Sequence, residues 1–186
     1  MSEQRRDLGA NADLAALIRT IPDYPKPGIQ FRDITTLLLD ARGLGLSIER
    51  LAAAVADLKP DLIAGIEARG FVFGAALAHV LGCGLLMIRK KNKLPGAVLG
   101  INYALEYGHD RIEMHADACT PGARVLIIDD LIATGGTALA TVQLLAQAGA
   151  EVIGAAFVID LPDLGGAARL RDAGVRVNAL VEFAGD

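Results

Sequence analysis

The stretch that decides the fold reads Val125-Leu126-Ile127-Ile128-Asp129-Asp130-Leu131-Ile132-Ala133-Thr134-Gly135-Gly136-Thr137. Its four leading apolar residues predict a buried strand over Val125–Ile128. Two carboxylates follow at the carboxyl end of that strand, where open α/β sheets place their ligands. Small and hydroxyl residues then lead into a helix predicted over about Thr137–Ala148. This order of strand, acidic pair, glycine turn and helix predicts a ligand site.

The glycine turn has the properties of a phosphate site. Gly135 and Gly136 let the backbone approach a ligand closely and adopt positive φ. The N–H groups at the start of the following helix attract an anion, and Thr134 and Thr137 add hydroxyl donors. The turn has no lysine, and the G-x-x-x-x-G-K-[ST] pattern of nucleoside triphosphate sites is absent. A monophosphate is therefore favoured over a triphosphate.

The acidic pair needs a different task, because Asp129 and Asp130 would repel a phosphate. Carboxylates can accept hydrogen bonds from ribose hydroxyls, help to hold hydrated Mg²⁺, and stabilise positive charge that develops on a sugar carbon. Together with the turn they predict a ribose 5-phosphate site. The structural alternative is a solvated strand end followed by an ordinary turn.

The rest of the chain alternates between strands and helices. Alternation of this kind indicates an α/β fold in which right-handed crossovers build a mostly parallel, five-stranded sheet flanked by helices. Ser47 is the expected N-cap of its helix. The other predicted strands are Leu62–Ile66, Leu85–Ile88, Val152–Ile159 and Val175–Phe183, and the other predicted helices are Leu14–Thr20, Ser47–Leu58, Phe71–Leu81 and Leu164–Ala173.

A basic segment interrupts this alternation. It contains Lys90, Lys91 and Lys93 and is followed by two runs of alternating polarity, Val98–Leu105 and Arg111–His115. The pattern predicts a mobile loop and then an antiparallel hairpin beside the parallel sheet.

Composition limits the classes of protein to consider. The 186 residues are 53% apolar and 22% charged, which fits one folded domain, and the net charge of −4 lacks the basic excess of nucleic-acid-binding domains. Cys83 and Cys119 lie far apart and have no metal-site spacing, which favours a reduced, cytoplasmic setting. Gly70–Ile88 is uncharged and nearly long enough to span a membrane. Its Gly82-Cys83-Gly84 interruption instead predicts a helix, a turn and a buried strand.

The quoted stretch resembles the signature of the type I phosphoribosyltransferases, which bind phosphoribosyl pyrophosphate. Further segments resemble the adenine phosphoribosyltransferases within that group. Pro27–Ile34 resembles their N-terminal segment, and Ile66–Phe71 resembles their pyrophosphate loop. Arg89–Gly96 and Leu105–Gly108 resemble their mobile loop.

The resemblance implies the reaction of adenine with phosphoribosyl pyrophosphate to give AMP and pyrophosphate, with Mg²⁺ as cofactor. It also implies a homodimer and a single domain over residues 1–186, with a small hood largely within residues 1–40 and a flexible loop at about 90–108. The alternatives are transfer to another base, or a regulator that senses phosphoribosyl pyrophosphate without catalysis. Such a regulator is expected to have a DNA-binding domain or a basic face, and the sequence indicates neither.

The resemblance also implies residue roles. The 5-phosphate would lie on Ala133–Thr137, and Asp129 and Asp130 would hold the ribose hydroxyls and, through water and substrate, the metal. Glu106 would accept the proton that leaves the purine. Phe31 and Leu131 would enclose the base. The other implied substrate contacts are Gln30 and Arg32 near the base, Arg69, Arg89, Lys90 and Lys93 at the pyrophosphate, and Tyr107 beside Glu106.

Overall fold

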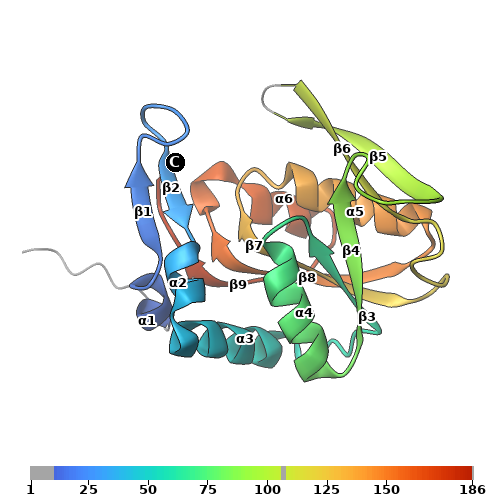
Figure 1. The fold of residues 1–186 in the computed structure, drawn as a ribbon, viewed down its shortest axis with the longest axis horizontal. Helices are drawn as coiled ribbons and strands as arrows, with labels where there is room; N and C mark the ends of the chain where they lie inside the picture. Colours follow the sequence, from blue (N-terminus) through green and yellow to red (C-terminus); the bar gives the residue numbers. More distant parts are fainter. Residues whose placement is uncertain (1–10, 106–107, 186) are drawn as a thin grey trace, which may run out of the picture.

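In the computed structural model, which describes residues 11–105 and 108–185, a mostly parallel sheet forms the centre of the molecule (Figure 1). Within these residues the sheet has seven strands in the order β5-β6-β4-β3-β7-β8-β9, and β4, β3, β7, β8 and β9 are parallel neighbours. The predicted five-stranded parallel sheet is thus confirmed. The strands are β3 (Leu62–Ile66), β4 (Gly84–Lys90), β5 (Val98–Leu105), β6 (Gly108–His115), β7 (Arg124–Ile132), β8 (Glu151–Asp160) and β9 (Val177–Glu182).

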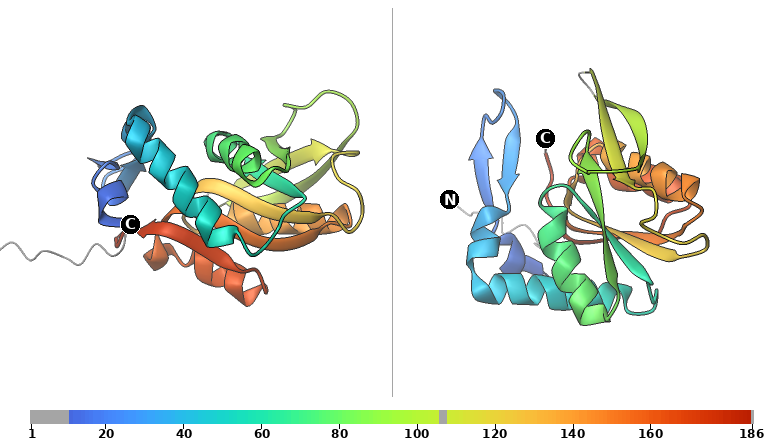
Figure 2. Two further views of the ribbon diagram at one scale, coloured as in Figure 1. Left: turned by 90° about the horizontal axis from the view of Figure 1, so that it is seen from below. Right: turned by 45° about the vertical axis from the view of Figure 1, so that its right-hand side comes forward.

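Helices cover both faces of the sheet (Figure 2). On one face α3 (Ala41–Val55) and α4 (Gly70–Leu81) contribute to a buried cluster that includes Leu126 and Ile128 of β7. On the other face α5 (Gly136–Gln147) and α6 (Gly166–Asp172) pack with Val125 and Ile127 of the same strand. Successive residues of β7 therefore point to opposite cores, which explains why its sequence is apolar without alternation.

The N-terminal part forms a separate antiparallel pair, β1 (Arg19–Pro22) and β2 (Gln30–Asp33), flanked by α1 (Ala12–Ala15) and α2 (Thr35–Leu39). This pair stands at the left of the main sheet in Figure 1. The helix predicted over Leu14–Thr20 is wrong, because α1 ends at Ala15 and the chain is already in β1 at Arg19.

The predicted start of the third helix is also wrong. α3 begins at Ala41, and the carboxylate of Asp40 accepts a hydrogen bond from the N–H of Gly43 at 2.7 Å. Ser47 is buried inside the helix, where its hydroxyl donates to the carbonyl of Leu44 at 2.7 Å. Gly43 and Gly45 disfavour a helix, so the sequence predicts a start after them. In the structure, packing and the Asp40 cap allow the helix to begin before them.

Two further boundaries bear on function. β7 continues to Ile132, so Asp129 and Asp130 lie within the last part of the strand, beside β8, rather than after it. Residues 70–88 form α4, a turn with Gly82 at φ +69° and most of β4, which confirms the predicted helix and turn. The strand is not buried throughout as predicted, because Leu85 and Met87 on it are exposed. Within the described part of the chain, no helix is long and apolar enough to cross a bilayer.

Candidate functional site

The turn between β7 and α5 is shaped to hold a small anion. It lines a pocket of about 140 Å³ with residues from the end of β7 and the start of α5. Gly135 caps α5 in the left-handed conformation, with φ at +81°. The first N–H groups of the helix, from Gly136 onward, have no helical partner and are available to a ligand at this end. Ala133 and Thr134 precede the helix, Thr137 lies in its first turn, and all three line the pocket.

Residues at the start of α6 stabilise this turn through hydrogen bonds. The N–H of Gly166 donates to the carbonyl of Ala133 at 2.9 Å, and Nη1 of Arg169 donates to the carbonyl of Thr134 at 3.0 Å. A Cβ atom on Gly135 would lie 2.9 Å from Cα of Gly166, so the two backbones fit together only because both residues are glycine. Sequence reasoning missed this support, although the Gly165-Gly166 pair was a visible signal.

The acidic pair is compensated by an arginine. Asp130 is 3% exposed, and its carboxylate accepts a hydrogen bond from Nε of Arg69 at 2.5 Å. Burial, followed by the neighbouring Asp130 carboxylate, raises the pKa of Asp129 well above its ordinary value. Asp129 also accepts a hydrogen bond from the N–H of Asp130 at 2.8 Å. Asp129 therefore lines the pocket, while Asp130 is buried beside it and Arg69 balances its charge.

The loop after β3 brings Arg69 to this position. It contains a cis peptide bond between Glu67 and Ala68, and α4 begins immediately afterwards at Gly70. A Cβ atom on Gly70 would lie 2.8 Å from the carbonyl oxygen of Ile128 and 2.9 Å from Oδ1 of Asp129. The loop can therefore lie against β7 only because a glycine follows Arg69, as the sequence Ala-Arg-Gly allows.

The other basic residues predicted to meet pyrophosphate lie at or just after the carboxyl end of β4, and two of them are paired with acids. Nε of Arg89 donates to Glu67 at 2.9 Å, and the guanidinium lies 5.7 Å from the centre of the Phe71 ring. Lys90 forms an ion pair with Asp110 of β6. Lys93 is exposed in the following turn. The sequence indicated the cations but gave no sign of these acidic partners.

The residues predicted near the base lie on β2 and β7. Phe31 is half-buried and meets Tyr24 edge-on, with ring centroids 5.2 Å apart. Gln30 precedes it on β2 and is half-buried too. Leu131, on β7, is half-buried and packs against the core cluster of α3 and α4.

Arg32 and Asp33 are adjacent on β2 but have different partners. Adjacent residues of a strand point to opposite faces, so the two side chains diverge. Asp33 instead pairs with Arg19 of β1. Arg32 lies over the ring of Phe183, 4.6 Å from its centroid, and donates to Oγ1 of Thr20 at 2.6 Å.

Glu106 and Tyr107 lie outside the described residues.

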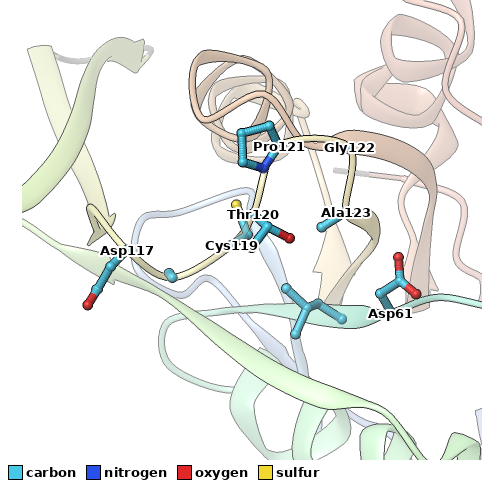
Figure 3. Close-up of a pocket in the computed structure, with 9 residues that line it drawn as sticks. Asp61, Asp117, Cys119, Thr120, Pro121, Gly122 and Ala123 are labelled. Atoms are coloured by element: carbon cyan, nitrogen blue, oxygen red, sulfur yellow. The ribbon is translucent and has the colours of Figure 1, made fainter.

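A larger cavity, of about 470 Å³, lies at the amino-terminal edge of the parallel strands (Figure 3). Asp61 and Asp117 stand on opposite sides of it, and Cys119 and Thr120 lie between them. Burial raises the pKa of the Cys119 thiol, which keeps the group protonated and less reactive. Open α/β sheets bind ligands at the opposite edge, so the size of this cavity does not make it the candidate site.

Comparison with known proteins identifies the family of the chain. The family model described as phosphoribosyl transferase domain matches residues 35–176. The chain belongs to the phosphoribosyltransferase family. An adenine phosphoribosyltransferase of Sphingopyxis alaskensis is 59% identical over 174 residues, which cover 94% of this chain and 95% of that relative.

Solved phosphoribosyltransferases share the fold. The crystal structure of an adenine phosphoribosyltransferase from Thermoanaerobacter pseudethanolicus has a TM-score of 0.88 at 46% identity, covering 92% of this chain and 99% of that one. The Saccharomyces cerevisiae enzyme, complexed with adenine and an iminoaltritol bisphosphate, has a TM-score of 0.85 at 35% identity, covering 91% and 97%.

Proposed function

We propose that this phosphoribosyltransferase transfers the 5-phosphoribosyl group of phosphoribosyl pyrophosphate to adenine, giving AMP and pyrophosphate in purine salvage. The observation that carries the proposal is the anion-binding turn beside a buried acidic pair, in a chain 59% identical to an adenine phosphoribosyltransferase over nearly its full length. The yeast relative was solved with adenine, which supports this choice of base.

In this proposal the turn and the acidic pair hold the sugar phosphate. The N–H groups of Gly135–Thr137 and the hydroxyls of Thr134 and Thr137 donate to the 5-phosphate. Asp129 and Asp130 accept hydrogen bonds from the ribose hydroxyls. As the bond from C1 to pyrophosphate breaks, positive charge develops on the ribose ring, and the same carboxyl oxygens stabilise it.

These carboxylates suit a Mg²⁺ ion that is shared with the substrate, rather than one that the protein alone surrounds. In the described ranges, 11–105 and 108–185, no three His, Cys, Asp or Glu side chains are grouped to hold a metal. Mg²⁺ commonly keeps several waters and binds through one or two carboxylates together with substrate phosphates. Asp129 and Asp130 would hold it through water, and the bound ion would neutralise charge on the pyrophosphate.

The pyrophosphate and the base would lie on either side of the sugar. Arg69, Arg89, Lys90 and Lys93 would neutralise the departing pyrophosphate. Gln30, Phe31, Arg32 and Leu131 would form the base side, with Phe31 stacking on the purine. N9 forms the new bond to C1, and the ring proton passes to Glu106, with Tyr107 beside it. Glu106→Gln should then lower kcat and leave the binding of phosphoribosyl pyrophosphate nearly unchanged, whereas an unchanged kcat would remove Glu106 from the mechanism.

The direct test is an assay of pyrophosphate release. The purified protein is mixed with phosphoribosyl pyrophosphate and either adenine, hypoxanthine, xanthine or a pyrimidine, with and without Mg²⁺. We expect release that depends on adenine and on the metal. Equal or faster turnover of hypoxanthine would reject adenine as the preferred base. Binding of phosphoribosyl pyrophosphate with no turnover of any base would favour the regulator.

We also propose a homodimer in the cytoplasm. An exposed apolar face on α4 and β4 supports the dimer, because Val72, Val80, Leu85 and Met87 are 37–56% exposed there. A second copy could cover this face, and the molar mass in solution tests the idea. The unbonded thiols of Cys83 and Cys119 are consistent with a reducing compartment.

A further inference from the structure

A polar network joins the end of β4 to the hairpin and to the anion-binding turn. Nζ of Lys90 donates to the hydroxyl of Tyr103 at 2.8 Å and forms an ion pair with Asp110. The Tyr103 hydroxyl donates to Oδ2 of Asp110 at 3.2 Å and accepts a hydrogen bond from Oγ1 of Thr137 at 3.1 Å. One tyrosine hydroxyl therefore contacts the lysine, its acidic partner and the phosphate turn.

The register of the sheet creates this network. Tyr103 and Asp110 are directly paired residues of β5 and β6, and Lys90 of β4 is paired with Ile112. Paired residues share a face of a sheet, and so do residues two apart on one strand. The three polar side chains must therefore meet on one face. Tyr103 is 8% exposed and packs in the core cluster that contains Ile112.

The network leaves Lys90 with a competing anion. The hydrogen bond from Lys90 is the main cause of the lowered pKa of Asp110, so the acid is a carboxylate at neutral pH. The lysine and aspartate side chains are 36% and 29% exposed, so water screens the pair only in part. A pyrophosphate that reaches Lys90 is a second acceptor for the same ammonium, and it meets the negative charge of Asp110.

We propose that Asp110 is a positioning residue that competes with pyrophosphate for Lys90. This inference rests on the proposed function, which assigns Lys90 to the pyrophosphate. In the free protein Asp110 holds the ammonium against the hairpin. When pyrophosphate binds Lys90, the ion pair between Lys90 and Asp110 must break. The pair forms again as the product leaves. Asp110 therefore weakens product binding and favours release.

The test is a calorimetric titration of the full chain with pyrophosphate and Mg²⁺. Asp110→Asn keeps the shape of the side chain and removes its charge, so we expect pyrophosphate to bind about 3- to 10-fold tighter, a modest gain because the pair is partly exposed. Lys90→Met should bind it about 10-fold more weakly. Asp110→Asn added to Lys90→Met should change the affinity by less than about twofold, because nothing remains to be competed for.

Matched variants distinguish competition for Lys90 from a loss of folding and from a general effect of the net charge of the protein. Asp110→Glu restores the carboxylate and should return the affinity towards that of the unmodified protein. Asp57→Asn removes the same charge from an exposed pair with Arg176, near the amino-terminal edge of the strands. This variant should leave the affinity for pyrophosphate unchanged. Thermal unfolding shows whether each variant is folded. Asp110→Ser replaces Asp110→Asn if the latter is unstable.

The outcomes distinguish the inference from the function beneath it. Unchanged or weaker binding by Asp110→Asn, while Lys90→Met binds weakly, would overturn the role of Asp110 and leave Lys90 in the site. Tightening that persists in the double variant would overturn it as well. Normal pyrophosphate binding by Lys90→Met would reject both this inference and the pyrophosphate role of Lys90.

Discussion

The turn after β7 and the β1–β2 pair carry opposite sides of the proposed site, and they are held in different ways. The turn continues a strand buried on both faces, and α6 fixes it through two hydrogen bonds to backbone carbonyls. β2 belongs to a two-stranded pair, and its half-buried Phe31 rests on Tyr24, which is 55% exposed. Substitutions in the turn should therefore remove function almost completely, whereas substitutions near the base should have graded effects.

The largest expected effect comes from Gly135→Ala. The new Cβ would lie 2.9 Å from the backbone of Gly166, so the turn must move. Displacement of a binding group by about 1 Å can cost about 100-fold in rate, and we expect a loss of kcat/KM for phosphoribosyl pyrophosphate of at least that size. Steady-state kinetics measures it.

Gly165→Ala is the matched control for the turn. Gly165 has φ +74°, close to that of Gly135, but no atom lies within 4 Å of its would-be Cβ. It should show only the cost of a left-handed alanine, about 1–2 kcal/mol of stability, with little loss of kcat/KM. Equal losses of activity in both variants would show that strain, and not the contact with α6, makes the turn sensitive.

A smaller effect is expected from Phe31→Ala on the base side. Stacking of a base on an aromatic ring contributes about 1–3 kcal/mol, so KM for adenine should rise about 10-fold while the dissociation constant of phosphoribosyl pyrophosphate stays the same. Tyr24→Ala removes the edge-on partner of Phe31 and leaves the stacking ring in place, so its effect on KM should be smaller. If Tyr24→Ala matches Phe31→Ala, the ring acts through the packing of the hairpin and not on the base.

The same contrast explains how far the sequence predicts the structure. The individual strands and the turn can be predicted from patterns local in the chain. An apolar run such as Val125–Ile128 indicates a buried strand, and the glycines after it indicate the turn. The support from Gly166, the Tyr103–Asp110–Lys90 network and the Arg19–Asp33 pair join residues far apart in the chain or on neighbouring strands. No local pattern specifies these contacts, because strand register and helix packing create them.

The smallest expected effect concerns stability at the acidic pair. Asp129 has a raised pKa because it is buried beside Asp130, so between its ordinary value and the raised value the folded state binds more protons than the unfolded state. Stability should therefore fall as pH rises through that window and remain lowered above it. Asp129→Asn should remove this penalty. Under the proposed function it should also weaken binding and turnover, because the amide lacks the negative charge of the carboxylate.

Urea unfolding of the two proteins between pH 4.5 and 8 measures this effect. We expect the free energy of unfolding of the variant to be higher by about 1 kcal/mol towards the upper end of the range and by progressively less towards pH 4.5. A gain independent of pH would mean that the amide packs better and that the charge of Asp129 is not costly. A loss at every pH would mean that its carboxylate stabilises the strand end. The expected result would show that β7, whose other residues are mostly buried and apolar, carries a destabilising acid at Asp129 that function requires.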